Sequence, residues 1–224
     1  MPVEPATPKS ERTRARILSA AHELFAEKGF AATTMRDIAE RAEVSVGATY
    51  RYFARKEDLG VALYEQMAER MTRVAMDLPG GSVADRFAVM MRATIDHLEQ
   101  RRDTFLALAA RAFDPRDDLG VLGTHTDSVR AQARAGWEIV VLGADDAPRD
   151  EVARTHLADA LYAADLLVVL VWTQDRDPAR LATKEAITAM VQLMAAGMPF
   201  LWTPFGAAAL SQVAGVASRL GIGR

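Results

Sequence analysis

The sequence predicts an all-α protein in which a small three-helix N-terminal module precedes a larger helical body. Two observations support this fold class. Apolar residues recur at helical spacing in nearly every segment of the 224 residues, and no segment alternates like a half-buried strand. Residues that start or end helices also punctuate the chain at short intervals, as expected for a bundle.

Composition places the chain among ordinary soluble proteins, with half of its residues hydrophobic and a quarter charged. There is no cysteine, so disulfides and cysteine-based metal sites are excluded. Residues 1–13 lack the apolar segment of a signal peptide, and the longest apolar run, 166–172, is too short to cross a bilayer. We therefore expect a cytoplasmic protein without a membrane partner.

The charge is distributed unevenly along the chain. Residues 9–56 carry ten Lys and Arg against six Asp and Glu, whereas residues 57–224 carry seventeen against twenty-three. The net charge of −3 argues against nucleic acid, but this distribution places a basic module ahead of an acidic body. Charge alone fits nucleic-acid binding and chance scatter about equally.

The first elements are a polar arm and an amphipathic helix. Residues 1–9 contain several prolines and no apolar periodicity, so we expect a disordered arm. The helix predicted over 10–27 has one apolar stripe, which ends in Leu24 and Phe25. Gly29 follows in the position that commonly ends a helix.

Two short helices are predicted next, over 34–41 and 45–53, and complete a domain of residues 10–56. Thr34 and Ser45 offer the side-chain oxygens that cap helix N-termini. The second of these helices begins with small residues, so its N-terminal end can lie deep in a DNA groove. Two short helices joined in this way form a helix-turn-helix, which makes residues 10–56 a candidate DNA-binding domain.

A linking helix over 57–77 is predicted to connect this domain to a body of residues 78–224. Pro79, Gly80 and Gly81 end the linking helix. Capping residues and prolines then mark the starts of further helices. The predicted body helices span 82–101, 103–113, 119–142, 146–173, 177–196 and 203–220.

The N-terminal quarter of the chain carries a family resemblance. The segments ILSAA (17–21), LFAEKGF (24–30), VSVGATYRYF (44–53) and KEDL (56–59) resemble the TetR family of bacterial transcriptional repressors. This resemblance implies a homodimer that binds double-stranded palindromic operator DNA and is released by a small-molecule effector. The family often has Gly where this chain has Glu43, and a positive φ there would cost Glu about 1 kcal/mol.

The resemblance also implies DNA contacts. Tyr50 and Tyr52 match phosphate-contacting positions, and Arg36 matches a position that reaches a base edge. Lys56 starts a helix whose free N–H groups already favour an anion, so its ammonium is expected at the same phosphate. The predicted DNA-contacting residues are Thr34, Arg36, Ser45, Val46, Gly47, Ala48, Thr49, Tyr50, Arg51, Tyr52 and Lys56.

Several of these residues allow more than one interpretation. Ser45 can cap the helix, donate its hydroxyl to a phosphate, or do both. Gly47 destabilises a helix interior by about 0.5–1 kcal/mol, which close approach to DNA explains better than a tight helix crossing. Val46 and Ala48 can read only groove shape or thymine methyl groups, so the operator sequence is not predicted.

In the body, large flexible and aromatic side chains indicate a pocket for an apolar or amphipathic molecule. Plain core packing is the alternative. No cofactor or metal is predicted, because His97, His125 and His156 lack ligand spacing. The candidate ligand-binding residues are Met90, Met91, Phe105, Phe113, Trp137 and Trp172.

The last two long helices are candidates for the dimer interface. The first is apolar almost all round, which predicts burial on every side. Two copies of the pair would form a four-helix bundle across a two-fold axis, although the same residues can simply fill the core. The candidate interface residues are Leu166, Val169, Trp172, Met190, Leu193 and Met194.

Two other function classes fit the sequence less well. An enzyme would need a nucleophile elbow, a metal site or a phosphate loop, and no catalytic residue is predicted. The alternative to DNA binding is a protein-binding adaptor that retains the helix-turn-helix fold. In the favoured mechanism, a ligand in the body shifts the linking helix and changes the spacing of two DNA-binding domains.

Overall fold

The computed structural model describes residues 8–114, 116–201 and 203–219, and within them it contains ten α-helices, one 3₁₀ turn and no strand. The prediction of an all-α fold is therefore confirmed. The predicted arm lies mostly outside the described residues, and its last two residues, Pro8 and Lys9, belong to the first helix. The elements are α1 (Pro8–Ala32), α2 (Met35–Arg41), α3 (Val46–Tyr52), α4 (Lys56–Met76), α5 (Val83–Gln100), α6 (Arg102–Ala112), η1 (Thr124–Thr126), α7 (Asp127–Leu142), α8 (Glu151–Gln174), α9 (Leu181–Leu201) and α10 (Pro204–Arg219).

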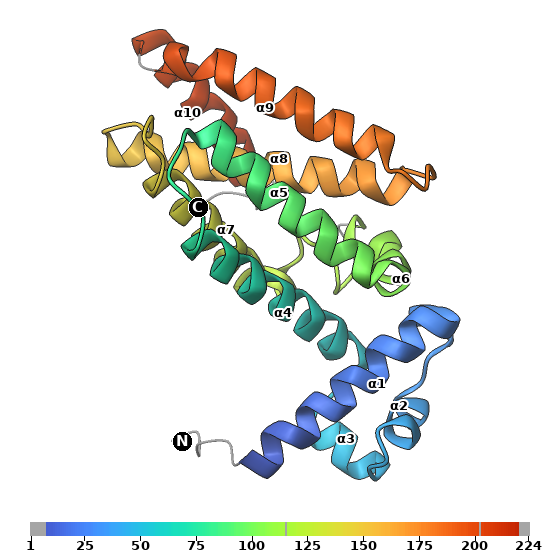
Figure 1. Ribbon diagram of the computed structural model, residues 1–224. Helices are drawn as coiled ribbons and strands as arrows, with labels where there is room; N and C mark the ends of the chain where they lie inside the picture. The colour runs from blue at the N-terminus through green and yellow to red at the C-terminus, as the bar shows by residue number, and fades with distance from the viewer. Residues whose placement is uncertain (1–7, 115, 202, 220–224) are drawn as a thin grey trace, which may run out of the picture.

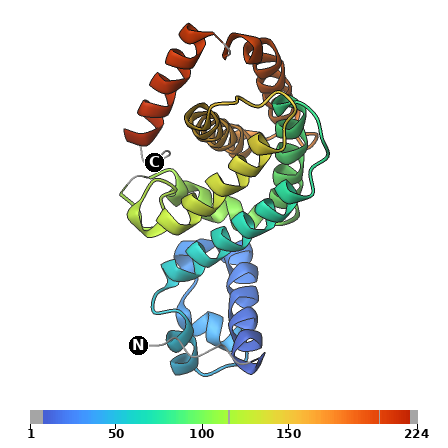
Figure 2. The same ribbon diagram turned by 90° about the vertical axis from the view of Figure 1, so that its left-hand side faces the viewer.

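The helices form two bodies that share α4 (Figures 1 and 2). The N-terminal body gathers α1, α2 and α3 around the start of α4, and the C-terminal body holds α5 to α10. Each body has its own hydrophobic core. Leu59 and Leu63 of α4 belong to the first core, whereas Met71 and Ala75 belong to the second. The predicted linking helix at 57–77 corresponds to α4.

Local sequence signals account for the N-terminal body. The stripe of α1 buries Ile17 and Phe25, and Gly29 interrupts the helix with a φ of 81°. Thr34 and Asp37 form a reciprocal capping box at the start of α2, with N–H to oxygen distances of 3.2 and 2.8 Å. These signals fix the ends of both helices around one apolar face.

The turn between α2 and α3 adopts a left-handed backbone at Glu43, where φ is 50°. The guanidinium of Arg16 donates to the carbonyl oxygens of Ala42 and Glu43, and it also pairs with the exposed Glu43 carboxylate at 3.3 Å. An exposed ion pair contributes little, whereas a positive φ costs a non-glycine residue about 1 kcal/mol. The turn is therefore held by its backbone acceptors rather than by the charge of Glu43.

A buried arginine organises the C-terminal body. Arg86 of α5 donates from Nε to the carbonyl of Val140 at 2.8 Å, and its other nitrogens donate to the carbonyls of Ile139, Leu78 and Pro79. These acceptors lie near the C-terminal end of α7 and just after the end of α4. One buried side chain therefore joins the C-terminal end of α7 to the segment that follows α4.

The predicted helix over 119–142 is shorter in the structure. Residues before Asp127 form turns and η1, and only Asp127–Leu142 is α-helical. A Cβ at Gly120 would lie 2.6 Å from the carbonyl oxygen of Asp114, so the chain turns too tightly there for any other residue. The glycines therefore end the helix on its N-terminal side.

Two predicted helix starts also differ. The carboxylate of Asp150, not Asp146, caps α8, while Asp146 accepts from the backbone of Val83. The segment predicted to begin a helix at Asp177 is a turn, and α9 begins later, at Leu181, with Asp175 accepting from the Thr183 N–H at 2.9 Å. In both cases an aspartate near the predicted start serves a different backbone donor.

The C-terminal body reaches into the N-terminal core through α6 and the segment after it. Leu108 and Leu119 are fully buried there, against α1 and α4. A Cβ at Gly60 would lie 2.7 Å from Cδ2 of Leu119, so α4 carries a glycine where this leucine packs. The contact between the two bodies is thus direct and does not depend on α4 alone.

The helix α8 is long and apolar enough to cross a membrane by length and composition. It packs against α7, α9 and α10, yet only 39% of its most apolar window is buried. An exposed apolar surface of this kind marks an interaction site.

We predict that Glu43→Gly stabilises the protein by about 1 kcal/mol, because glycine adopts the positive φ without steric cost. Glu43→Ala is the matched control, since it removes the same carboxylate and keeps the strain. Chemical denaturation of both variants measures the difference. Equal stability of the two variants would contradict the assigned strain.

Candidate DNA interface and effector cavity

The N-terminal end of α3 presents a slim, exposed surface. Ser45, Val46 and Gly47 are exposed, and Ala48 is half-buried. A Cβ placed on Gly47 would meet no heavy atom within 4 Å in the described chain, so tight packing within the molecule does not explain this glycine. Of the two interpretations of Gly47, close approach of an external partner is the one that the geometry supports.

The hydroxyl of Thr34 at the start of α2 and the hydroxyl of Ser45 at the start of α3 each accept a backbone hydrogen bond. Ser45 Oγ accepts from the Ala48 N–H at 3.1 Å, and Thr34 Oγ1 accepts from Asp37. Capping uses a lone pair and leaves the hydroxyl proton free to be donated. Both interpretations of Ser45 are therefore compatible with this geometry.

Tyr50 and Tyr52 differ in their surroundings. The Tyr50 side chain projects from α3 and the residue is 51% exposed. The Tyr52 hydroxyl instead bonds Ser10 and Thr13 of α1, which lowers the pKa of Tyr52, and the Arg51 guanidinium lies 5.7 Å from its ring centre. Tyr52 thus joins α3 to α1, and Tyr50 is free for an external contact.

Arg36 lies on the exposed side of α2. Neither a hydrogen bond nor an ion pair engages its side chain within the described residues. Its guanidinium is thus free for an external acceptor beside α3. As for the other exposed residues named above, contact with DNA stays a prediction.

Two residues of the predicted contact set are engaged within the molecule. Thr49 is fully buried, because it faces the core of the N-terminal body. The ammonium of Lys56 donates to the carbonyls of Phe30 and Thr33 at 2.6 and 2.7 Å and lies 4.5 Å from the Phe30 ring centre. Lys56 therefore fastens the end of α1 to α4 instead of presenting a free charge.

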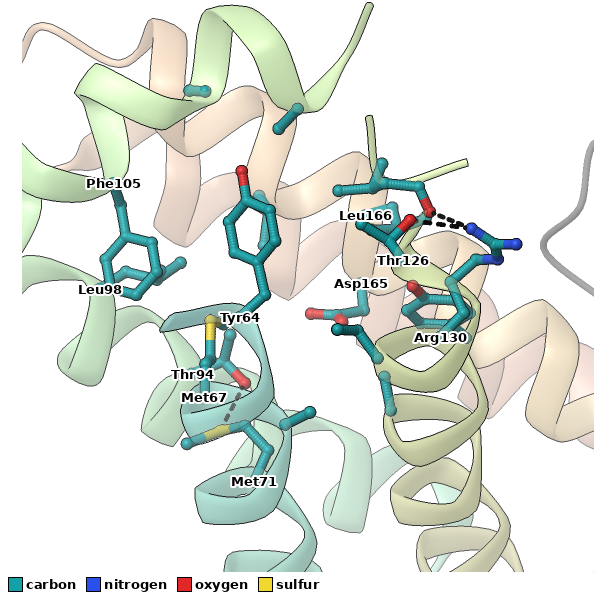
Figure 3. Close-up of a pocket in the computed structure, with 18 of the residues that line it drawn as sticks. Tyr64, Met67, Met71, Thr94, Leu98, Phe105, Thr126, Arg130, Asp165 and Leu166 are labelled. Carbon is teal, nitrogen blue, oxygen red and sulfur yellow. Dashed lines mark hydrogen bonds between the residues drawn. The ribbon is translucent and has the colours of Figure 1, made fainter. Parts of the chain in front are cut away.

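The C-terminal body contains an apolar cavity between α4, α5, α6, α7 and α8 (Figure 3). The volume of the cavity is about 130 Å³, close to the roughly 150 Å³ of an apolar cavity that holds benzene, and the cavity is partly open to solvent. Of the six predicted ligand-binding residues, Met91 is buried in the core away from it. The other five line the cavity: Met90, Phe105, Phe113, Trp137 and Trp172.

Polar groups in the cavity wall were not anticipated from the sequence. The Asp165 Oδ1 and the Tyr64 hydroxyl are buried and have no hydrogen-bond partner within the part of the chain that the structure describes. Burial raises the pKa of Asp165 to about 7, although a hydrogen bond from Trp137 opposes the shift. The signal was present, because Asp165 is the single charged residue between Leu161 and Trp172.

Comparisons with known proteins identify the family of the chain. A family model described as bacterial regulatory proteins, tetR family, matches residues 17–63. The HTH-type transcriptional repressor Rv3405c of Mycobacterium tuberculosis (strain ATCC 25618 / H37Rv) is 32% identical over 167 residues, which cover 67% of this chain and 88% of that protein. The chain belongs to the TetR family of transcriptional regulators.

Other TetR relatives extend over both bodies. The HTH-type transcriptional regulator TtgR of Pseudomonas putida is 40% identical over 174 residues, covering 71% of this chain and 83% of that protein. A crystal structure of a TetR transcriptional regulator from Rhodococcus sp. RHA1 shares the fold, with a TM-score of 0.61 at 22% identity. It covers 83% of this chain and 97% of that chain.

The predicted dimer-interface residues of this TetR protein lie on two different surfaces. Leu166, Val169 and Trp172 line the cavity instead of facing outward, and Trp172 donates its indole N–H to Glu99 at 2.6 Å. On α9, Met190 and Met194 are half-buried against the core, whereas Leu193 is 69% exposed. The three predicted residues of α8 therefore belong to its inward face, because the helix is apolar on both sides and its sequence does not distinguish them.

Exposed apolar residues occur on all of the last three helices. Large apolar side chains remain exposed on α8, α9 and α10, and Phe205 at the start of α10 is 74% exposed. The exposed apolar residues of these helices are Val152, Leu167, Leu170, Leu181, Leu193, Phe200, Phe205, Val213 and Val216.

We predict that Asp165→Asn removes a pH-dependent loss of stability. The folded-state pKa of Asp165 is above its ordinary value of 3.8, so the native state favours the protonated form. Stability is therefore fully present below about pH 4 and is lost as pH rises through 7. Between pH 5.5 and 8.5 the native protein should lose on the order of 2 kcal/mol relative to Asp165→Asn.

Denaturant titrations of both proteins at the two pH values measure this loss. Other ionisable groups cancel in the comparison, because the two proteins differ at one side chain. An identical pH dependence for both proteins would show that Asp165 is an ordinary, solvated carboxylate.

Proposed function

We propose that this TetR protein is a cytoplasmic repressor that binds palindromic operator DNA as a homodimer and is released by a small apolar or amphipathic effector. The observation that carries the proposal is the free N-terminal end of α3. It combines an open Gly47, small neighbours and an exposed Tyr50, beside the unpaired guanidinium of Arg36. Such a surface fits a major groove, with a phosphate contact at its edge and a base contact beside it.

The homodimer is supported by the apolar outward face of α8, α9 and α10. A single helix-turn-helix reads few bases, and two-fold dimers place their recognition helices one DNA turn apart, at about 34 Å. Exposed leucine, valine and phenylalanine side chains on three adjacent helices fit a self-complementary interface. An interface on this face also explains why α8 is apolar on the side turned away from its own core.

The coupling between effector and DNA is supported by a segment that has a role in both bodies. One side of α6 and the segment after it lines the cavity, through Phe113 and Val121. From the same segment, Leu119 packs in the N-terminal core, and Asp118 accepts from Arg55 at 2.6 Å. An effector that fills the cavity displaces this wall and α4 together, which changes the spacing of two DNA-binding domains.

Binding-site selection from random duplex DNA tests the function. We expect enrichment of an inverted repeat and a steep loss of affinity with salt, because phosphate contacts release counterions. A protein-binding adaptor would select no sequence and would bind duplex DNA negligibly at physiological salt.

Two substitutions separate base from phosphate contacts. Arg36→Ala should weaken binding to the selected duplex about tenfold or more and relax its sequence preference at one position. Tyr50→Phe should weaken binding to selected and random duplexes alike. Arg149→Ala, an exposed arginine of the C-terminal body, is the matched control and should leave both affinities unchanged. Fluorescence anisotropy on the two duplexes distinguishes these results.

Charge substitutions on the exposed apolar side chains of α9 and α10 test the proposed dimer interface. Leu193→Glu and Phe205→Glu should yield monomers by sedimentation velocity, since each buries a charge in an apolar interface. Met76→Glu places the same charge at a residue of α4 that is 66% exposed, and should leave the dimer intact. Dimers that survive both substitutions would place the interface elsewhere.

A further inference from the structure

We propose that the effector is a lipophilic amine whose protonated nitrogen binds the carboxylate of Asp165; this inference rests on the proposed ligand-responsive function. The cavity wall is otherwise apolar and aromatic over most of its surface. Its lining comes from α4, α5, α6, α7 and α8 and from the segment between α6 and α7 (Figure 3). The class of ligand then depends on which polar group in this wall lacks a partner.

The unsatisfied group is an acceptor. Asp165 Oδ1 is buried without a hydrogen bond, although Trp137 donates to the same carboxyl group. A buried polar atom without a partner is costly, and a buried carboxylate without a counter-charge is more so. A ligand that brings both an N–H donor and a positive charge compensates both costs at one atom.

The cation in the wall is not available to a ligand anion. Arg130 of α7 donates to the carbonyls of Val121 and Gly123 and to Thr126, and it also pairs with Asp127. Its guanidinium is thereby engaged in holding the turns before α7. An anionic ligand would have to break these bonds and would also face the charge of Asp165.

The aromatic side chains favour a cation over a neutral donor. Phe105, Trp137, Tyr162 and Trp172 line the same cavity, and aromatic faces attract ammonium groups. The Tyr64 hydroxyl is a second polar group of the cavity wall that is buried without a hydrogen-bond partner among the described residues. An alcohol would satisfy one hydrogen bond and leave the carboxylate charge uncompensated.

The pH dependence follows from the groups that face Asp165. The other ionisable residues in the lining are Tyr64 of α4, Tyr162 of α8 and Arg130 of α7, whose guanidinium pairs with Asp127. Neither tyrosine loses its proton between pH 6 and 8, because burial raises the pKa of both. The lining contains no histidine. Ionisation of Asp165 should therefore raise amine affinity about tenfold over this range, while alkylamines stay protonated, as lysine does.

Isothermal titration calorimetry on the full chain with decylamine, decanol and decanoate tests the inference. We expect decylamine to bind at least tenfold more tightly than either analogue at pH 8, and Asp165→Asn to remove that advantage without weakening decanol. Asp145→Asn, an exposed acid outside the cavity, is the charge control and should bind like the native chain.

A native chain that does not bind decylamine, or that prefers decanol or decanoate, would overturn the inference. So would unchanged decylamine affinity in Asp165→Asn. A pH series on the native chain tests the same carboxylate without a variant: amine affinity should rise from pH 6 to 8, and decanol affinity should not. Amine binding that leaves DNA affinity unchanged would refute the proposed release mechanism while the amine site stands.

Discussion

The structure depends on one helix that belongs to two hydrophobic cores. The first turns of α4 bury Leu59 and Leu63 against α1, and its last turns bury Met71 and Ala75 against the C-terminal body. A helix packed at both ends cannot move one end without changing contacts at the other. The segment around Leu119 adds a second connection at Gly60, so the N-terminal body is attached to the cavity wall by two parallel contacts. In the proposed mechanism, these contacts make the cavity relevant to DNA.

The two proposed sites differ in exposure and polarity. The α3 surface is open, polar at its edge and small at its centre, so that a large charged partner can approach it. The cavity is apolar and largely buried, and one carboxyl oxygen in its wall has no hydrogen-bond partner among the described residues. Such an oxygen persists because the packing of the surrounding helices offsets its cost. In the cavity, a ligand that donates to this oxygen would relieve that cost.

The sequence predicted the N-terminal body well because its signals are local. Thr34, Asp37 and Ser45 cap backbone groups within one helical turn of their own positions. Gly29 interrupts α1 through its own positive φ. In the C-terminal body, Asp150 and Asp175 accept from the first turns of helices that neighbouring aspartates were expected to begin, because each of those neighbours accepts from a different backbone donor. The inward placement of the Thr49 and Lys56 side chains was not visible in the sequence for a similar reason. Their orientation depends on α1 packing, which no short motif encodes.

Arg86 has a mechanical consequence. Its four carbonyl acceptors fix the C-terminal end of α4 against α5 and α7. In the proposed mechanism, an anchored end favours rotation of α4 about Arg86 over translation of the whole helix. The helix spans 21 residues, or about 30 Å, so under such a rotation the end that carries the N-terminal body would move farthest. The buried guanidinium would then be the pivot of the motion that changes the spacing of the two DNA-binding domains.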